Sequence, residues 1–173
     1  MERDGSQRKG IDSMGKVSMS TGSCQCGQIQ YTVEGESLMT YACHCKDCQK
    51  RTGSAFSMGA VYPLTALSVT GELTAWKRVS DDGHSNTRFS CSGCGNIIYG
   101  VGSATASIIK LQPGTLDASE NVTIDAHIWT RSAQAWLQLP EGVVTHETQP
   151  DDLMELYKAV LENRQQSTNR RQK

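Results

Sequence analysis

Two short segments of this chain end alike in Cys-Gly: Cys24-Gln25-Cys26-Gly27 and Cys91-Ser92-Gly93-Cys94-Gly95. In a zinc knuckle the backbone turns tightly beneath the metal, and glycine permits the positive φ that this turn can require. Two such knuckles bring four thiolates together, which is a complete tetrahedral ligand set for a structural zinc. We therefore expect all four cysteines to share one zinc ion that pins two hairpins together. The alternative is a disulfide or a group of buried thiols without metal.

The remaining three of the seven cysteines lie in one segment, Cys43-His44-Cys45-Lys46-Asp47-Cys48. If the segment is extended, Cys43 and Cys45 face the same side while His44 faces away. A turn after Cys45 can then return Cys48 to the same metal. Three thiolates leave the fourth position of a tetrahedral zinc open, as in catalytic zinc sites. The alternative is a second closed site, completed by one distant histidine: His84, His127 or His146.

The charge of this open site bears on its chemistry. Zn²⁺ with three thiolates has a net charge of about −1, so a bound water is acidified less than at a site of three neutral histidines. A thiol is easily deprotonated on zinc and stays nucleophilic. We therefore expect chemistry on a thiol or a thiol adduct, with hydration and isomerisation as alternatives.

Two histidines are candidate partners of this site. His44 adjoins two of the expected ligands, so we expect it to be a catalytic neighbour or a buried hydrogen-bonding group rather than a ligand. His127 lies next to Trp129 in a predicted strand. It is the candidate hidden ligand or catalytic partner, and a histidine satisfied within the core is the alternative.

Length and composition restrict the class of protein. A chain of 173 residues with a formal net charge of −1 can form one domain with a core and has no electrostatic reason to bind nucleic acid or a membrane. It lacks a long apolar run and a signal-peptide pattern, so we expect a cytoplasmic protein whose clustered cysteines bind metal. We expect a disordered leader over 1–18, a single zinc-binding domain over 19–162 and a disordered polar tail over 163–173.

The body of the chain is predicted to be mainly β, because short apolar or alternating runs are separated by Gly, Pro, Asp and Asn. This pattern favours an antiparallel sandwich or open barrel, with a tight turn at Gly71-Glu72. One short helix is expected from about 151 to 163, with Asp151 or Asp152 as its cap. The predicted strands are Gln28–Val33, Phe56–Tyr62, Leu67–Thr70, Leu73–Val79, Thr87–Ser90, Asn96–Val101, Ala106–Leu111 and Ala126–Thr130.

Three cysteine-containing segments, Gly22–Gly27, Cys43–Phe56 and Cys91–Gly95, together resemble a known family. It is the glutathione-dependent formaldehyde-activating (GFA) enzyme family, which also includes the centromere protein V type of domain. All three motifs are present in order, and the resemblance covers roughly residues 21–150. The segment 128–131 also resembles the family's late strand, which lies near the active zinc.

The resemblance implies an antiparallel β-tent-like zinc-binding fold with two zinc ions per chain. It assigns Cys24, Cys26, Cys91 and Cys94 to a structural zinc, and Cys43, Cys45 and Cys48 to a catalytic zinc. The founding activity is formation of S-hydroxymethylglutathione from formaldehyde and glutathione, formally that of a carbon–sulfur lyase. In the hypothesised mechanism the open zinc position binds and deprotonates the thiol, which attacks formaldehyde or another small electrophile. Members of the family are diverse, so the fold and metal sites transfer better than the substrate.

Glutathione carries two carboxylates, so a site for it should offer cations. Arg51 follows the metal loop directly and is the first candidate, for catalysis and for substrate binding. The other candidate cations are Lys50, Lys77, Arg78 and Arg131, and the aromatic residues that can wall a pocket are Phe56, Trp129 and Trp136. Ordinary surface or packing roles are the alternative for each of these residues.

Three functions fit the sequence. The first is a zinc-dependent carbon–sulfur lyase acting on a glutathione-type adduct of a small aldehyde or other electrophile. The second is a zinc-dependent hydrolase, dehydratase or isomerase of a small secondary metabolite on the same scaffold. The third is a non-enzymatic zinc-scaffold binding protein, which is disfavoured because the chain has no long basic arm.

Overall fold

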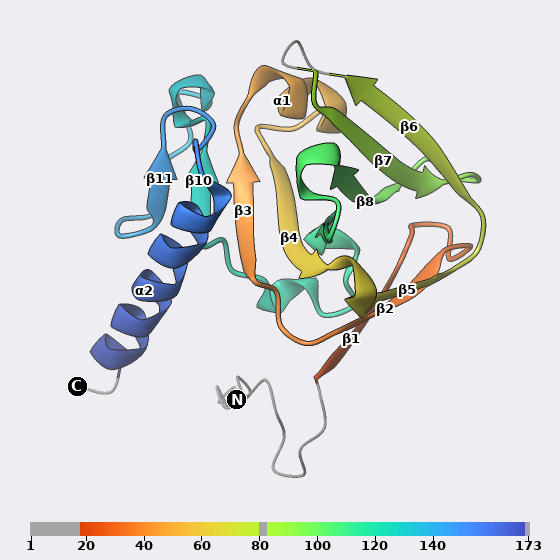
Figure 1. Cartoon of the computed structure of the whole chain (residues 1–173), viewed down its shortest axis with the longest axis horizontal. Helices are drawn as coiled ribbons and strands as arrows, with labels where there is room; N and C mark the ends of the chain where they lie inside the picture. The colour runs from red at the N-terminus through yellow and green to blue at the C-terminus, as the bar shows by residue number, and fades with distance from the viewer. Residues whose placement is uncertain (1–17, 80–82, 172–173) are drawn as a thin grey trace.

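The computed structural model describes residues 18–79 and 83–171. Within them, short strands make up most of the body and helix α2 lies along one side (Figure 1). The strands are β1 Met19–Ser23, β2 Gln30–Glu34, β3 Met39–Cys43, β4 Ser57–Pro63, β5 Leu67–Thr70, β6 Leu73–Val79, β7 Ser85–Cys91, β8 Ile97–Gly102, β9 Ile108–Leu111, β10 Ala126–Ile128 and β11 Val144–His146. The α-helices are α1 Lys46–Thr52 and α2 Leu153–Arg171, and the 3-10 helices are η1 Leu64–Ala66, η2 Ser103–Thr105, η3 Pro113–Thr115, η4 Ser119–Asn121 and η5 Thr130–Ser132. The mainly β fold with a C-terminal helix is confirmed.

The strands form two sheets. The small sheet has the order β1-β2-β5, and the large sheet has the order β11-β10-β3-β4-β9-β8-β7-β6. Paired strands are antiparallel, as expected, except that β10 runs parallel to both β3 and β11. A parallel pair needs a long connection that returns the chain to the same end of the sheet. The segment between Ile128 and Val144 supplies this connection for β11.

Gly71 marks the point where the chain passes from the small sheet to the large one. The chain bends between β5 and β6, but these strands do not pair with each other. The φ of Gly71 is 100°, and a Cβ added there would lie 2.3 Å from the backbone oxygen of Gln28. Glycine is therefore required twice here, by the positive φ and by the close approach of another backbone segment.

The sequence predicted neither β3 nor α1, the two elements that carry the central cysteines. β3 is buried at four of its five positions, so it has no polar alternation to reveal it. α1 has only 7 residues, none of them buried, so it lacks an apolar stripe. The edge strands β1 and β11 were also missed.

Helix α2 begins close to the expected residue but ends later. Asp152 precedes it, and its Oδ1 accepts a hydrogen bond from the Met154 N–H at 2.7 Å. The helix continues through Arg171, so it is longer than the expected short helix ending near residue 163, and it includes most of the segment expected to be a polar tail. Neither Gly nor Pro interrupts residues 151–171, and Arg164 anchors the helix through two hydrogen bonds to Asp125. Residues 1–17 and 172–173 of the predicted leader and tail lie outside the described residues.

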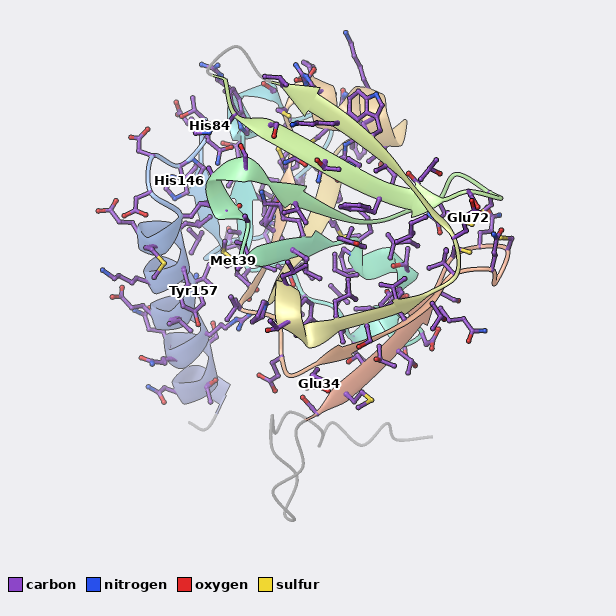
Figure 2. All side chains as sticks on the ribbon, turned by 45° about the vertical axis from the view of Figure 1, so that its right-hand side comes forward. Glu34, Met39, Glu72, His84, His146 and Tyr157 are labelled. Atoms are coloured by element: carbon purple, nitrogen blue, oxygen red, sulfur yellow. The ribbon has the colours of Figure 1, made fainter. Side chains whose placement is uncertain are left out.

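The apolar core has two parts, on opposite faces of the large sheet. Ile109 and Leu111 of β9 pack against Tyr31 and Val33 of the small sheet. On the other face, a second cluster centres on α2 and β3, and Met39 of this cluster is labelled in Figure 2. The cluster comprises Met39, Cys43, Val61, Ala126, Ile128, Leu156 and Val160. No helix within the described residues is both long and apolar enough to cross a membrane.

Candidate metal centres and the adjoining cavity

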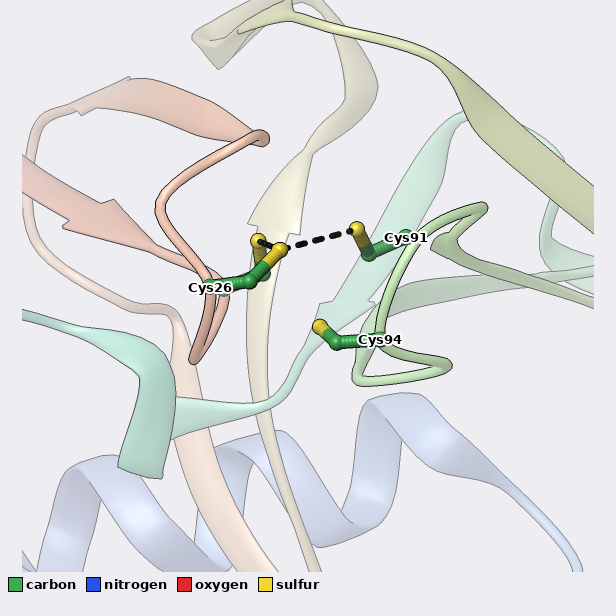
Figure 3. Close-up of side chains that lie close together, drawn as sticks. Cys26, Cys91 and Cys94 are labelled. Carbon is green, nitrogen blue, oxygen red and sulfur yellow. Dashed lines mark hydrogen bonds between the residues drawn. The ribbon is translucent and has the colours of Figure 1, made fainter.

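Four cysteines from two hairpins meet at one point. Cys24 and Cys26 lie in the β1–β2 connection, and Cys91 and Cys94 lie where β7 turns into β8 (Figure 3). All four Sγ atoms lie within 4.8 Å of one another, with Cys24–Cys26 at 3.4 Å and Cys26–Cys91 at 3.7 Å. A tetrahedral zinc with Zn–S bonds of about 2.3 Å needs an S···S separation of about 3.8 Å. The group therefore fits a zinc ion, and the described cysteines are free thiols, not disulfides.

The backbone of each hairpin has the knuckle geometry that the Cys-Gly endings predicted. Gly27 and Gly95 have φ values of 77° and 72°, and each donates its N–H to the carbonyl of the first cysteine of its pair. Burial opposes ionisation of Cys24. Hydrogen bonds from the Ile29 N–H and the neighbouring thiols outweigh burial and lower the pKa of Cys24 to about 6. The group joins the small sheet to the large one.

The three central cysteines form a second, smaller group. Cys43 ends β3, Cys45 is the N-cap of α1, and Cys48 lies in the first turn of that helix. Their Sγ atoms lie within 4.8 Å of one another. Among residues 18–79 and 83–171 no His, Asp or Glu completes the group, so His84, His127 and His146 are not brought to it.

The turn expected after Cys45 is the start of α1. The Cys45 Sγ accepts a hydrogen bond from the Cys48 N–H at 3.4 Å, which is the bond an N-cap makes to the N3 position. The helix ends at Gly53, whose φ of 62° suits a left-handed C-cap. The helix geometry itself therefore brings Cys48 back to the other two thiols.

Gln49 of α1 fixes this helix against the loop that follows β10. Its Nε2 donates to the carbonyls of His44 at 2.6 Å and Ser132 at 2.8 Å, and its Oε1 accepts from Gln134 Nε2 at 2.9 Å. These bonds connect the cysteine segment with η5, which begins one residue after Trp129. The position of Trp129 relative to the open group is therefore held by hydrogen bonds.

Arg51 lies directly beside the open group. Its Nη2 donates to Ser57 Oγ at 2.8 Å and lies 3.5 Å from Cys48 Sγ. Hydrogen bonds from the Cys43 and Cys45 thiols outweigh burial, with help from Arg51, and lower the pKa of Cys48 to about 2. These contacts favour the thiolate form of Cys48, which is the form that binds a metal.

A cavity of about 960 Å³ opens onto the three central cysteines. It lies over one face of the large sheet, because alternate residues of several strands line it: Met39, Tyr41 and Cys43 of β3, Asn86, Arg88 and Ser90 of β7, and Ile108 and Lys110 of β9. Leu153 and Leu156 of α2 and Trp129 contribute to the same cavity. Its volume is in the range of small-molecule binding sites.

Trp129 lines the cavity in a strained conformation. Its φ of 60° is the one positive value found for a non-glycine residue within the described residues. Its Nε1 donates to Gln149 Oε1 at 3.2 Å, and the Arg131 guanidinium lies 5.0 Å from the ring centroid. A left-handed conformation costs roughly 1–2 kcal/mol, and such strain is concentrated at functional sites.

Several residues predicted for the site lie elsewhere. Arg131, Lys77 and Trp136 do not line the cavity, and Trp136 is 71% exposed. Phe56 lines a separate cavity of about 900 Å³, which Arg51 also reaches. Lys50 and Arg78 do line the main cavity, and Arg78 pairs with Asp47 at its rim.

His44 and His127 form a buried pair behind the open group. The His44 Nε2 and His127 Nδ1 atoms are 2.9 Å apart, and neither residue lines the main cavity. Burial lowers the pKa of both histidines, and for His127 the neighbouring His44 adds to this effect. Side chains alternate along β3 and β10, so the pair faces away from Cys43 and Ile128. If His44 has the predicted catalytic role, the effect is indirect, through the residues that it contacts, because its side chain does not reach the main cavity.

Sequence reasoning missed two cations of the cavity, Arg88 and Lys110. Both are partly buried and lie on central strands of the large sheet. The one available signal was a basic residue inside an otherwise apolar run, Ile108-Ile109-Lys110-Leu111. Nothing in the sequence indicates that Arg88 faces the same cavity.

A mainly β fold with one four-cysteine and one three-cysteine group, consistent with two metal sites, defines a class of cysteine-ligated metal-binding proteins. The sequence profile of the glutathione-dependent formaldehyde-activating enzyme family matches residues 19–132. The chain belongs to this family.

Individual relatives agree over a shorter region. Proteins of Emericella nidulans and Fusarium vanettenii are each 34% identical over 77 residues, which cover 44% of this chain and 39% and 41% of theirs. A Sordaria macrospora protein is 34% identical over 74 residues, 43% of this chain and 31% of its own. All three carry the provisional description of glutathione-dependent formaldehyde-activating enzyme. The match thus spans less than half the length of each relative.

A crystal structure of a Rhodobacter sphaeroides protein also matches, with a TM-score of 0.47 and 21% identity, covering 60% of this chain and 90% of that one.

Proposed function

We propose that the protein is a zinc-dependent enzyme that forms or cleaves a carbon–sulfur bond between a glutathione-type thiol and a small aldehyde or other electrophile. The observation that carries the proposal is the contrast between the two cysteine groups. The four-cysteine group has a full tetrahedral set and joins two sheets, whereas the three-cysteine group is one ligand short and opens onto the cavity. An incomplete ligand set beside a cavity is the arrangement of a catalytic zinc.

The donor set suits zinc and suits sulfur chemistry. Three thiolates within 4.8 Å of one another match the soft ligands that zinc accepts. Zinc bound there would supply a Lewis acid that favours the thiolate form of a substrate thiol. We assign the four outer cysteines to a structural zinc and the three central ones to the catalytic zinc, which gives two ions per chain.

The reaction itself needs no redox cofactor. In the condensing direction the thiol loses its proton, its sulfur forms a bond to the carbonyl carbon, and the carbonyl oxygen takes up a proton. The chain's own residues position the reactants. Arg51 holds Cys48 through the contact with its Sγ, and Trp129 walls the cavity. The fixed positions of these groups reduce the reorganisation needed at the moment of reaction.

The test is exchange spectroscopy by NMR with glutathione and formaldehyde. The zinc-loaded protein is expected to accelerate the exchange above the spontaneous rate, and the Cys45→Ser variant is expected not to. Metal analysis should give two zinc ions for the wild type and one for Cys45→Ser. A wild type that holds two zinc ions but gives no acceleration would exclude this reaction and favour a hydrolase, dehydratase or isomerase on the same scaffold.

A further inference from the structure

A single row of residues crosses the floor of the cavity. In the register of the large sheet, Trp76 of β6 is opposite Arg88 of β7, Arg88 is opposite Gly100 of β8, and Gly100 is opposite Lys110 of β9. Directly opposed residues of paired strands project from the same face. Arg88 and Lys110 therefore flank Gly100 on the cavity side, and both line the cavity.

The missing side chain at Gly100 lets Arg88 extend over β8. A Cβ added at Gly100 would lie 2.2 Å from Arg88 Nη1 and 3.0 Å from Arg88 Cδ. Lys110 extends over β8 too, because a Cβ added at Gly102 would lie 3.0 Å from Lys110 Nζ. The two cationic side chains thus reach over the same strand from opposite sides, above two glycines that leave the space open.

Neither cation has an acidic partner within the described residues. The ion pairs found there are Arg78–Asp47 and Arg164–Asp125, so Asp47, the one acidic residue of the cavity wall, is already paired. Lys110 Nζ makes a single long contact, 3.5 Å to Thr105 Oγ1. Arg88 makes no hydrogen bond to any described residue through its guanidinium, although it is partly buried.

The two charges act on each other. Burial lowers the pKa of Lys110, and the positive charge of Arg88 lowers it further. Burial, and after it the positive charge of Arg51, lower the pKa of Arg88, and the charges of Tyr41, Cys48 and Cys43 oppose this only in part. Desolvation and mutual repulsion make the charged forms of both side chains less favourable. A bound anion would stabilise the two charges.

We propose that Arg88 and Lys110, over Gly100, form a subsite for an oxyanion of the substrate, a carboxylate or a phosphate. The guanidinium offers a planar pair of N–H donors and the ammonium a point charge, which together suit such a group. The subsite extends the proposed function, because it would hold the acidic end of a thiol whose sulfur lies at the three-cysteine group. Carboxylate-bearing thiols are then the preferred substrate class, and their neutral esters are poor ligands.

The subsite can be tested without any thiol chemistry. Binding of succinate and of inorganic phosphate to the zinc-loaded protein is measured by calorimetry at low ionic strength, with succinamide as the neutral control. The wild type is expected to bind at least one of the two anions saturably and to ignore succinamide. Arg88→Gln and Lys110→Gln should each weaken anion binding about tenfold or more, the loss expected for a charge-assisted hydrogen bond.

Two further variants separate the subsite from general charge and from misfolding. Lys77→Gln makes the same charge change on β6 outside the cavity and should leave binding unchanged. Gly100→Ala keeps every charge but places a methyl group against the Arg88 side chain, so it should weaken binding. Thermal unfolding of Lys110→Gln should occur no earlier than in the wild type, because the variant removes a cation whose charged form burial disfavours.

Failure of the subsite and failure of the proposed function are distinguishable. The subsite is wrong if the wild type binds neither anion, or if Lys77→Gln loses as much affinity as Arg88→Gln. It is also wrong if the wild type turns over glutathione and formaldehyde while Arg88→Gln and Lys110→Gln keep the same KM for glutathione. Anion binding that depends on Arg88 and Lys110 without turnover would support the subsite and overturn the carbon–sulfur chemistry.

Discussion

Replacing Cys45 by serine should remove a ligand of the open group while the chain stays folded, whereas Cys94→Ser should unfold it. Cys45 is the N-cap of α1, and its Sγ accepts the Cys48 N–H. Serine is among the best N-cap residues, and replacing such a cap by alanine costs about 1 kcal/mol. We therefore expect Cys45→Ser to keep the wild-type free energy of unfolding, apart from any contribution of zinc, and Cys45→Ala to be about 1 kcal/mol less stable than Cys45→Ser.

Cys94 differs because its group connects two sheets. The contact between Cys26 and Cys91 joins residues 65 positions apart, and each belongs to a different hairpin. A structural zinc contributes roughly 10–16 kcal/mol of apparent binding free energy, while a domain of this size has a total stability of about 5–15 kcal/mol. The loss of one of four ligands can therefore remove most of the net stability, although Cys94 is itself exposed.

The assay is urea unfolding followed by circular dichroism, together with zinc analysis of each purified variant. Cys45→Ser and Cys45→Ala should each retain one zinc ion and a cooperative transition, and Cys94→Ser should lose the transition. Equal destabilisation by Cys45→Ser and Cys94→Ser would refute the division into an open and a structural site. It would mean that both groups serve mainly to hold the fold.

Three stability predictions concern other parts of the fold, each measured by urea unfolding. Gly71→Ala should lower the free energy of unfolding by roughly 2–4 kcal/mol, because its Cβ would meet the Gln28 backbone. Gly35→Ala is the control: Gly35 has a φ of 79° but open space around it, so the loss should be only about 1 kcal/mol. Equal losses in the two variants would contradict this explanation. Arg164→Met should cost about 1–2 kcal/mol by breaking the bonds to Asp125, and an unchanged midpoint would show that this ion pair does not anchor α2. Leu156→Ala should cost roughly 2–5 kcal/mol, because its side chain is 1% exposed, and a loss below 1 kcal/mol would mean that α2 packs loosely.

The parts of the site that could be predicted from the sequence are those whose geometry is set by residues close together in the chain. The knuckles were predictable because a Cys-Gly turn is formed by neighbouring residues, and Gly27 and Gly95 have the expected positive φ. The position of Arg51 was predictable because it lies three residues after Cys48, about one helical turn. In contrast, Phe56 and Arg131 have apt chemistry but do not line the main cavity.

The elements missed in the sequence were those without a local pattern. β3 is buried on both faces and so does not alternate, and α1 is a short helix formed around the cysteines themselves. The length of α2 was underestimated because the polar residues after 162 form a helix whose anchor, Asp125, lies 39 positions away from Arg164. These outcomes depended on contacts with distant segments, which local propensity cannot anticipate.

The grouping of the cysteines within each outer pair and within the central triplet could be derived from spacing alone, because each is held within one turn of backbone. The Cys-Gly endings also predicted that the two outer pairs meet, and the folded sheets bring them together. The cation pair over Gly100 had no such signal and depends on the folded sheets alone. Arg88 and Lys110 are 22 residues apart and share no motif, and they meet because the pairings β7–β8 and β8–β9 place both beside one glycine. A shift of register by one residue would turn either side chain to the opposite face. The charge that faces the cavity is therefore a property of strand pairing and not of any one segment.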